Sequence, residues 1–397
     1  MRSTTENEEA ARLMRQFAQR TGLTDAGHAP KRYLWTDAFA VCNYLGLAMT
    51  HDDATMRGHA AQLVDQVHGV LGRHRPDDSR SGWISGLDED AGADAPTAGG
   101  LRIGKELPER AADAPHDERL EWSRDGQYFH YLTKWMHALF RVGQVCRDER
   151  YLRWAVHLAK RAHRSFTYRT AAGQLRMHYK MSIDLTRPLV ASMGHHDPLD
   201  GLVTYLELQR TGQKLGIALD VELSEMAEMC AGRSWATHDP LGLGGLLFDA
   251  FRLAQLVVDG CADGAEDLLL TILADCASGL RVFAAADTLG RRADVRIGFR
   301  ELGLATGLRA IPPLSALVTR EWARFPNHDA LESVLQRLAS FQRHGTAIEL
   351  FWMTPESRRS PTWVEHLDIN EVMLATSLEP LGFLSVNCVP PEPKPQS

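Results

Sequence analysis

The sequence predicts an all-α fold, an (α/α)6 toroid in which six buried helices form a ring and six amphipathic helices wrap it. Three observations predict this fold. A His-Asp-Pro-Leu phrase twice precedes an apolar run, in "GHHDPLDGLVTYLEL" (194–208) and "THDPLGLGGLL" (237–247). Helices that are apolar nearly all round alternate along the chain with amphipathic ones. Strand signals are few, and only one short hairpin is expected, over residues 169–184.

Each repeated phrase is typical of a helix start. An Asp side chain caps free backbone N–H groups, and Pro fits the first helical position, where its missing donor is not needed. We therefore expect Asp197 and Asp239 to cap two buried helices. Four similar starts complete a set of six inner helices, which begin near residues 36, 125, 197, 239, 298 and 368.

The outer ring is predicted from segments with one polar and one apolar face. They lie at 5–22, 52–74, 147–166, 220–232, 264–283 and 328–344. One toroid domain is expected over residues 1–388, followed by a disordered Pro-rich tail at 389–397. The longest loop, 74–120, is expected to be either a functional lid or disordered, because ordinary loops are shorter than about 15 residues.

Composition limits the partners. The formal net charge of −7 argues against a broad nucleic-acid surface, because phosphate binding draws on positive charge. The six cysteines form no CxxC pair, so we expect reduced thiols and a cytoplasmic protein. The sequence shows no secretory signal and no uninterrupted apolar run of about 18 residues, so we expect no membrane partner. No cofactor is expected, and the oligomeric state is left open.

Two stretches carry a resemblance to known enzymes. The segment "WMHALFRVGQVCRDERYLRWAVHLAKRAH" (135–163) resembles the repeating unit of six-hairpin carbohydrate enzymes, which include unsaturated glucuronyl hydrolases and N-acylglucosamine 2-epimerases. "RYLWTDAFAVC" (32–42) is similar to the first inner helix of the epimerases. Arg32 and Trp35 match that pattern, whereas Phe39 stands where the family has an arginine. The resemblance implies a toroid and chemistry on a sugar.

The inner-helix N-termini are expected to converge on one mouth of the ring. Their unpaired N–H groups favour anionic or hydroxyl-rich ligands there. Acid–base chemistry on a sugar uses carboxyl groups or histidine. The catalytic candidates are Glu121, Asp125, His196, His238 and Asp37. The substrate-binding candidates are Trp35, Arg102, Lys105, Trp122, Gln127, Tyr128, His130, Lys134, His178, Lys180, Asp200, Trp235, Glu301, His366 and Glu371.

Structural interpretations of the same residues stay open. Asp197 and Asp239 need no role beyond capping, and aromatic residues at helical spacing usually pack in a core. His195, His196 and Asp200 offer metal ligands, but no HExxH or cysteine cluster supports them, so no metal is assigned. "TAGGLRIGK" (97–105) lacks P-loop spacing.

The favoured function is a carbohydrate-active enzyme, of hydrolase or epimerase type. It would act on a sugar or uronic-acid-like ligand in the central cavity by general acid–base chemistry. The alternatives are a cyclase or transferase of specialised metabolism and a non-catalytic ligand-binding scaffold. The acidic segment "GLDEDAGADA" (86–95) does not match the DxDD motif of class II terpene cyclases, which disfavours a cyclase of that kind.

Overall fold

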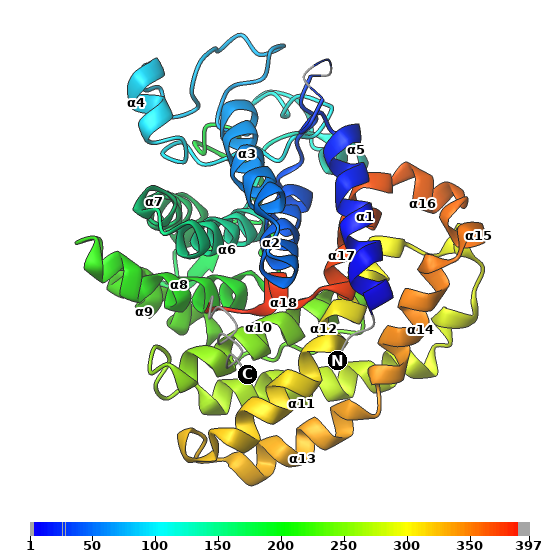
Figure 1. Cartoon of the computed structure of the whole chain (residues 1–397). Helices are drawn as coiled ribbons and strands as arrows, with labels where there is room; N and C mark the ends of the chain where they lie inside the picture. Colours follow the sequence, from blue (N-terminus) through cyan, green and yellow to red (C-terminus); the bar gives the residue numbers. More distant parts are fainter. Residues whose placement is uncertain (1–3, 26, 28, 388–397) are drawn as a thin grey trace, which may run out of the picture.

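The computed structural model describes residues 4–25, 27 and 29–387, and they are mostly helical. Six helices form an inner ring in which each contacts the next and the sixth contacts the first (Figure 1). These helices are α2 (Leu34–His51), α6 (Phe129–Cys146), α8 (Asp197–Lys214), α10 (Pro240–Val258), α12 (Gly298–Arg320) and α17 (Leu367–Leu378). The predicted toroid is therefore confirmed, while the predicted tail at 389–397 lies outside the described residues.

Outer helices pack against the inner ones. They are α1 (Thr4–Arg20), α3 (Ala54–Leu71), α7 (Glu149–Phe166), α9 (Asp220–Cys230), α11 (Glu266–Ala285), α13 (His328–Ala339) and α14 (Gln342–Met353). The single helix predicted over 328–344 is wrong, because the chain turns at Ser340 and Phe341 and both α13 and α14 pack on α12. The short helices α15 (Pro355–Arg358) and α16 (Pro361–Glu365) lead on to α17.

The predicted start of the second inner helix is also wrong, since α6 begins at Phe129 instead of near Asp125. The Asp125 carboxylate accepts hydrogen bonds from the backbone N–H groups of Gly104 and Gly126. Gly126 has a φ of 149°, outside the helical region, and the next two residues form strand β1 (Gln127–Tyr128). The other five inner helices begin within two residues of the predicted positions.

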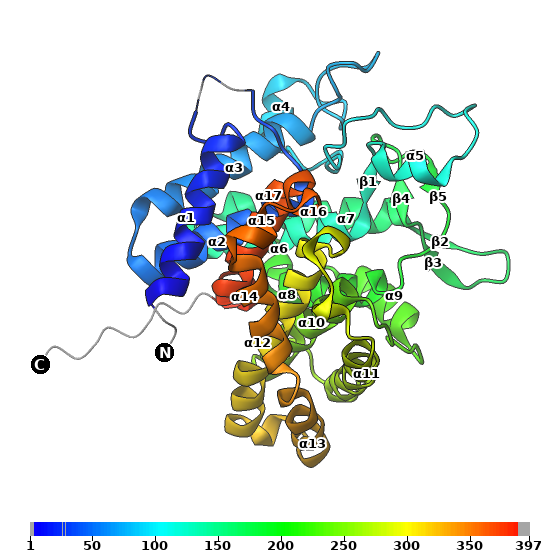
Figure 2. The same ribbon diagram turned by 90° about the vertical axis from the view of Figure 1, so that its right-hand side faces the viewer.

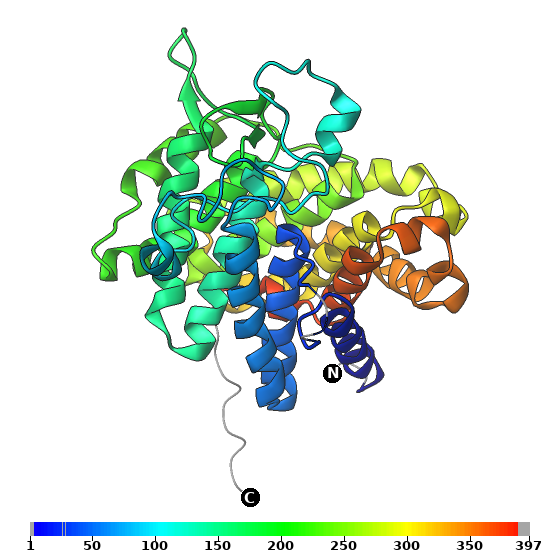
Figure 3. The same cartoon turned by 90° about the horizontal axis from the view of Figure 1, so that it is seen from above.

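Three short strands form a small sheet in the order β1-β4-β5, with β4 at Lys180–Met181 and β5 at Pro188–Val190. Tyr128 pairs with Lys180 in the antiparallel register of β1 and β4. The expected hairpin is confirmed as β2 (Thr167–Arg169) and β3 (Leu175–Met177). Figures 2 and 3 show these strands gathered on one side of the molecule with α5 (Glu118–Ser123).

The segment 74–120 is ordered. It contains α4 (Glu89–Asp94) and runs past the start of α2, where the Leu34 N–H donates to the Ile103 carbonyl. The N–H of Arg102 donates to the Leu71 carbonyl at the end of α3, and that of Ile103 donates to the Gly126 carbonyl. Three parts of the toroid thus hold this segment, and we call residues 74–120 the lid.

One end of the ring interior is filled by α18 (Leu381–Leu384), which contacts α2 and α10 (Figure 1). The Phe383 ring stacks on Phe39 with centroids 4.2 Å apart and meets Phe248 edge-on at 5.3 Å. The Phe383 carbonyl is 2.7 Å from Nε2 of His137. These contacts fill the ring interior between α2, α6 and α10.

Helices α10, α11 and α12 are long and apolar enough to cross a membrane by length and composition. Most of that apolar stretch is buried inside the molecule for α10 and α12, and a smaller part is buried for α11. The ring itself therefore accounts for the apolar character of the two inner helices.

Candidate functional site

Aromatic rings line the N-terminal end of the ring. Tyr33 precedes α2, Tyr128 precedes α6, and Tyr179 precedes β4, which pairs with β1. The hydroxyls of Tyr33 and Tyr131 are 2.6 Å apart, and the Trp35 and Tyr131 rings lie 6.5 Å apart. Tyr128 lies 5.1 Å from Tyr131 and 5.2 Å from Tyr179. We call these five rings the aromatic mouth.

His130 lies against this mouth. Its imidazole stacks on Tyr128 at 5.3 Å and on Tyr179 at 5.4 Å, with interplanar angles of 29° and 27°. Nδ1 of His130 is 3.5 Å from Oδ1 of Asp197. Among the described residues, neither Nδ1 of His130 nor Oδ2 of Asp197 has a hydrogen-bond partner, although both atoms are buried. The pair is therefore close enough to tighten into a hydrogen bond when a ligand binds, as catalytic pairs often do.

The expected capping role of Asp197 is wrong. The N-cap of α8 is His196, without a side-chain cap, and Asp197 lies inside the first turn. Its carboxylate lies against Gly194, where a Cβ would come within 2.3 Å of Oδ2. Asp239 does cap α10, because its Oδ2 accepts from the Gly242 N–H at 2.8 Å, and its Oδ1 also holds Arg300 at 2.5 Å. The two similar phrases thus use their aspartates differently.

The repeated phrases lie side by side at the mouth. A Cβ on Gly242, in the second phrase, would come 3.3 Å from Cε1 of His196, in the first. Nε2 of His196 bonds to the Trp235 carbonyl at 3.1 Å, and burial lowers the pKa of His196 to about 4. His196 is therefore neutral at pH 7, while His238 is exposed at the surface. The Trp235 side chain is fully buried beside His195 and His196.

One helical turn below His130, Lys134 donates to Asp200 with Nζ and Oδ1 2.5 Å apart. Thr133 donates to the other oxygen of the same carboxylate. The Asp200 carboxylate thus compensates the charge of the buried Lys134 ammonium, which would be costly to bury alone. This pair lies under the mouth, on the same faces of α6 and α8 that carry His130 and Asp197.

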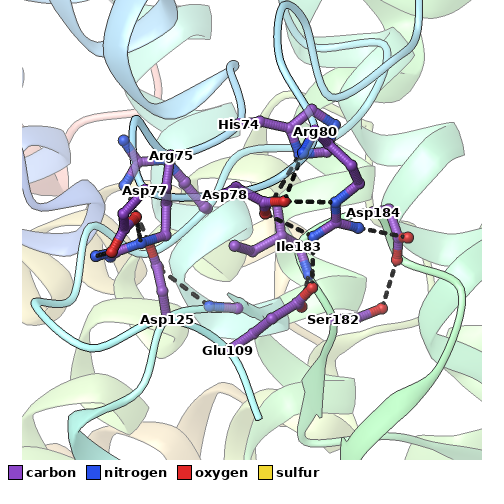
Figure 4. A network of polar contacts seen from close by, with 12 residues as sticks. His74, Arg75, Asp77, Asp78, Arg80, Glu109, Asp125, Ser182, Ile183 and Asp184 are labelled. Atoms are coloured by element: carbon purple, nitrogen blue, oxygen red, sulfur yellow. Dashed lines mark hydrogen bonds and ion pairs between the residues drawn. The ribbon is translucent and has the colours of Figure 1, made fainter. Parts of the chain in front are cut away.

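The lid adds a cation to the mouth. The Lys105 ammonium lies 5.6 Å from the Tyr33 ring centroid, and burial lowers the pKa of Lys105. Its loop is fixed by Asp125, which binds Nη1 of Arg102 at 3.0 Å and the Gly104 N–H at 3.0 Å. Arg75 also reaches the Asp125 carboxylate (Figure 4). Asp125 and Arg102 thus position Lys105 without facing the mouth.

A second arginine ties the lid to the small sheet. Arg80 binds Asp78 and Glu109, both in the lid, and Asp184 in the β4–β5 turn, with contacts of 2.6–2.8 Å (Figure 4). Glu109 also accepts from the Ile183 N–H at 2.6 Å. The Arg80 guanidinium lowers the pKa of Asp78 to about 2. The lid is therefore fastened beside the strand that places Tyr179.

Other candidates serve ion pairs or packing. Asp37 pairs with Arg32 and accepts from the Tyr33 N–H, and burial raises its pKa to about 6. The remaining partners are as follows: Glu121 with Arg110 and Lys180, Gln127 with the backbone of Gly99, Leu101 and Ile183, Glu301 with Arg296 and Trp352, Glu371 with Arg20, His178 with Tyr168, and His366 with Phe299. The Trp122 side chain is half exposed and meets Tyr179 edge-on.

Among the predicted residues, the structure brings together Trp35, Lys105, Tyr128, His130, Lys134 and Asp200 in one cluster at the starts of the inner helices. Tyr33 and Tyr179 were not predicted. Tyr33 directly precedes the first inner helix, which is a local signal that the sequence does contain. Tyr179 reaches the mouth only because β4 pairs with β1, and no local pattern shows that pairing.

The described residues contain no group of three or more His, Cys, Asp or Glu side chains placed to hold a metal ion. Five of the cysteines lie in this part of the chain, and Cys42, Cys230 and Cys276 are buried. The sixth, Cys388, lies outside the described residues.

The sequence matches no protein-family profile and no curated protein. Among solved structures, a GH76 α-mannanase of Bacteroides thetaiotaomicron is 8% identical and covers 94% of this chain and 95% of its own, with a TM-score of 0.52. A cellobiose 2-epimerase of Spirochaeta thermophila is 11% identical, covers 96% and 100%, and has a TM-score of 0.49. A sugar epimerase from a ruminal bacterium is 9% identical, covers 87% of each chain, and has a TM-score of 0.49. The mannanase match shows that the toroid is shared along nearly the whole chain.

Proposed function

We propose that the protein is a sugar-processing enzyme that transfers a proton in the aromatic mouth, with His130 as the acid–base group and Asp197 as its partner. The observation that carries this proposal is the approach of Nδ1 of His130 to the Asp197 carboxylate, 3.5 Å away, while the imidazole stacks on two tyrosine rings. An Asp that holds Nδ1–H leaves Nε2 to exchange a proton with a substrate.

The surroundings suit a sugar. Aromatic faces pack against the C–H faces of sugar rings, and tyrosine hydroxyls add hydrogen bonds at the edges. The N-termini of the inner helices add positive potential that favours hydroxyl-rich or anionic ligands. Lys105 and Lys134 are then the groups that bind substrate oxygens from the lid and from below. The GH76 α-mannanase, which shares the fold, acts on a sugar polymer by its name.

The carboxylates favour proton transfer over glycoside hydrolysis. Hydrolysis usually needs two carboxyl groups across the scissile bond. At the inner-helix starts, Asp200, Asp239, Glu301 and Glu371 each hold a lysine or arginine. Asp197 has no such cation within salt-bridge distance in the described part of the chain and faces His130 instead. We therefore assign epimerisation or isomerisation, with proton transfer at a carbon next to a carbonyl.

The other catalytic candidates take supporting roles in this proposal. Asp37 fixes Tyr33 through its backbone N–H, Asp125 fixes the Lys105 loop, and Glu121 holds Lys180 next to Tyr128. His196 precedes Asp197, His238 precedes Asp239, and both bind substrate hydroxyls in this proposal. Each of these five residues then positions the mouth or its ligand instead of moving the proton.

The test is solvent exchange. The protein is incubated with a panel of aldoses and ketoses in deuterium oxide, and deuterium incorporation at carbon is followed by NMR. We expect incorporation with at least one sugar, a loss of about 100-fold in His130→Gln, and a smaller loss in Asp197→Asn, because a positioned acid–base group contributes about 100-fold or more. His51→Gln, which changes an exposed histidine at the end of α2, is the matched control and is expected to keep activity.

Two outcomes contradict the proposal. Exchange that survives in His130→Gln removes His130 from the chemistry. Release of a sugar from aryl glycosides without any exchange at carbon replaces proton transfer with hydrolysis, and the carboxylates then become the residues to vary.

A further inference from the structure

A pocket opens beside the repeated phrase of residues 237–247. It lies between the start of α10, the last turns of α11, and the segment of η1 (Thr288–Gly290) and η2 (Ala293–Val295) that leads into α12. Its volume is about 380 Å³. Asp239, Arg300 and His238 line it on the side of the repeated phrase. Asp239 starts α10, whose Gly242 lies beside His196, the residue before Asp197, so the pocket lies close to the proposed site.

One wall of the pocket is apolar and exposed. Val282, Val295 and Ile297 keep 55%, 65% and 42% of their surface exposed, and all three line this pocket. Pro240 and Phe283 extend the same wall. Clusters of large exposed apolar side chains mark binding surfaces more often than single ones do.

The lining also carries positive charge, from Arg291, Arg296 and Arg300. Arg291 is exposed, and its guanidinium makes no ion pair or hydrogen bond with residues 4–25, 27 and 29–387, while its backbone N–H donates to the Thr288 carbonyl. Arg300 uses one nitrogen for Asp239. Arg296 is committed to Glu301 and to the Leu289 carbonyl, so it is part of the frame. The pocket lining contains three arginines and two carboxylates, Asp239 and Glu301, so its net charge is +1. The whole chain has a formal net charge of −7.

We propose that this pocket binds an apolar group that carries an acidic substituent, a carboxylate or phosphate, as the part of the substrate next to the reacting sugar. The apolar body packs on Val282, Val295 and Ile297, and the acidic group binds Arg291 and the free nitrogens of Arg300. That the occupant is part of the substrate rests on the proposed function, whereas the preference of the pocket for an apolar acid does not.

The test compares two probes of the same shape, naphthoate and its neutral counterpart naphthylmethanol. Their dissociation constants are measured by ligand-observed NMR on the full chain. We expect naphthoate to bind about tenfold more tightly, because one charge-assisted contact contributes roughly this factor. Arg291→Gln is expected to remove most of the difference, and Arg300→Gln the remainder. Val282→Asp is expected to weaken both probes by about tenfold or more.

Matched controls are exposed residues on distant helices. Arg150→Gln on α7 and Val221→Asp on α9 carry the same changes and are expected to leave both affinities unchanged. His130→Gln is expected to keep naphthoate binding, because the pocket lies outside the aromatic mouth. Circular dichroism of each variant shows whether it has folded.

Equal affinity for the two probes, or unchanged binding in both Arg291→Gln and Val282→Asp, overturns the inference and leaves the exchange experiment at His130 standing. If the wild-type protein exchanges deuterium into none of the sugars tested but still prefers naphthoate, the pocket binds an apolar acid. Its assignment as part of the substrate site is then overturned. Competition between naphthoate and an active sugar for a single site also overturns the arrangement of two adjacent sites.

Discussion

At the scale of single residues, the notable feature is a chain of buried charges inside the ring, below the mouth. Glu207 of α8 binds Arg252 of α10 at 2.6 Å and also contacts His137 of α6. Asp249 lies one turn before Arg252 and is fully buried. Buried ions persist when they are paired, because an unpaired charge in a protein interior is costly. These paired side chains favour one orientation of α6, α8 and α10 about their helix axes, because a rotation of any of the three would separate the buried charges.

Asp249 gives this chain of charges a pH dependence. Burial and the neighbouring Asp200 charge raise its pKa from 3.8 to about 7. Between about pH 4 and 7 the folded state holds a proton that the unfolded chain releases, so this group lowers the free energy of unfolding as pH rises. Asp249→Asn cannot ionise, so the variant is expected to gain stability relative to wild type as pH rises from 4 to 8. The upper limit is about 4 kcal/mol for three pKa units.

Urea unfolding at pH 4, 6 and 8, followed by circular dichroism, measures this difference. Asp263→Asn changes an exposed carboxylate after α10 and serves as the control. A constant stability difference between Asp249→Asn and wild type across these pH values would show that Asp249 is ionised throughout.

At the scale of elements, local chemistry predicted the helix starts and long-range contacts decided the exceptions. Pro240 after a capping Asp239 is a complete local signal, and α10 begins there. Asp125 looks equally like a helix start, but its carboxylate is used by the Gly104 N–H, which comes from the lid. The break between α13 and α14 depends on both helices packing against α12. The local sequence pattern therefore does not predict contacts with residues that are distant in the sequence.

The crossing of α10 and α12 depends on glycines that the sequence shows without explaining. A Cβ on Gly244 would lie 2.3 Å from the Gly303 carbonyl oxygen, a distance that no rotamer can relieve. A Cβ on Gly245, the next residue, would meet nothing within 4 Å. Gly244→Ala is therefore expected to destabilise the fold by about 1–3 kcal/mol through overpacking. Gly245→Ala is expected to stabilise it by up to about 1 kcal/mol, because Ala has the higher helix propensity.

The midpoint of urea unfolding checks both signs with the same method. Opposite shifts of the unfolding midpoint in Gly244→Ala and Gly245→Ala would separate the effect of a steric clash with α12 from the effect of helix propensity. If both variants shift in the same direction, the close approach of the two inner helices is not a determinant of stability.

At the scale of the whole molecule, the ring could be predicted because each inner helix carries its own signals, and the site could be predicted only in part. Trp35, Tyr128, His130 and Lys134 stand at or near inner-helix starts, so the expected convergence places them correctly. Tyr179 depends on a strand pairing between residues 128 and 180. The use of Asp197 toward His130 instead of as a cap depends on how α6 and α8 lie side by side. Ring closure thus supplies the information that the local sequence lacks.

Helix α18 lies inside the ring and contacts both α2 and α10. Phe383 is fully buried against Phe39, Phe248 and His137. Phe383→Ala leaves the cavity of a large ring and is expected to lower the free energy of unfolding by about 3–5 kcal/mol. Leu381→Ala, in the same short helix but 40% exposed, is expected to cost much less. Unfolding in urea by circular dichroism and tryptophan fluorescence measures both, and equal midpoints would mean that α18 covers the ring without supporting it. If α18 does support the ring, the unfolding curves of Phe383→Ala followed by fluorescence and by circular dichroism are expected to have different midpoints. The packing of α2, α6 and α10 would then be lost at a lower urea concentration than their helical structure.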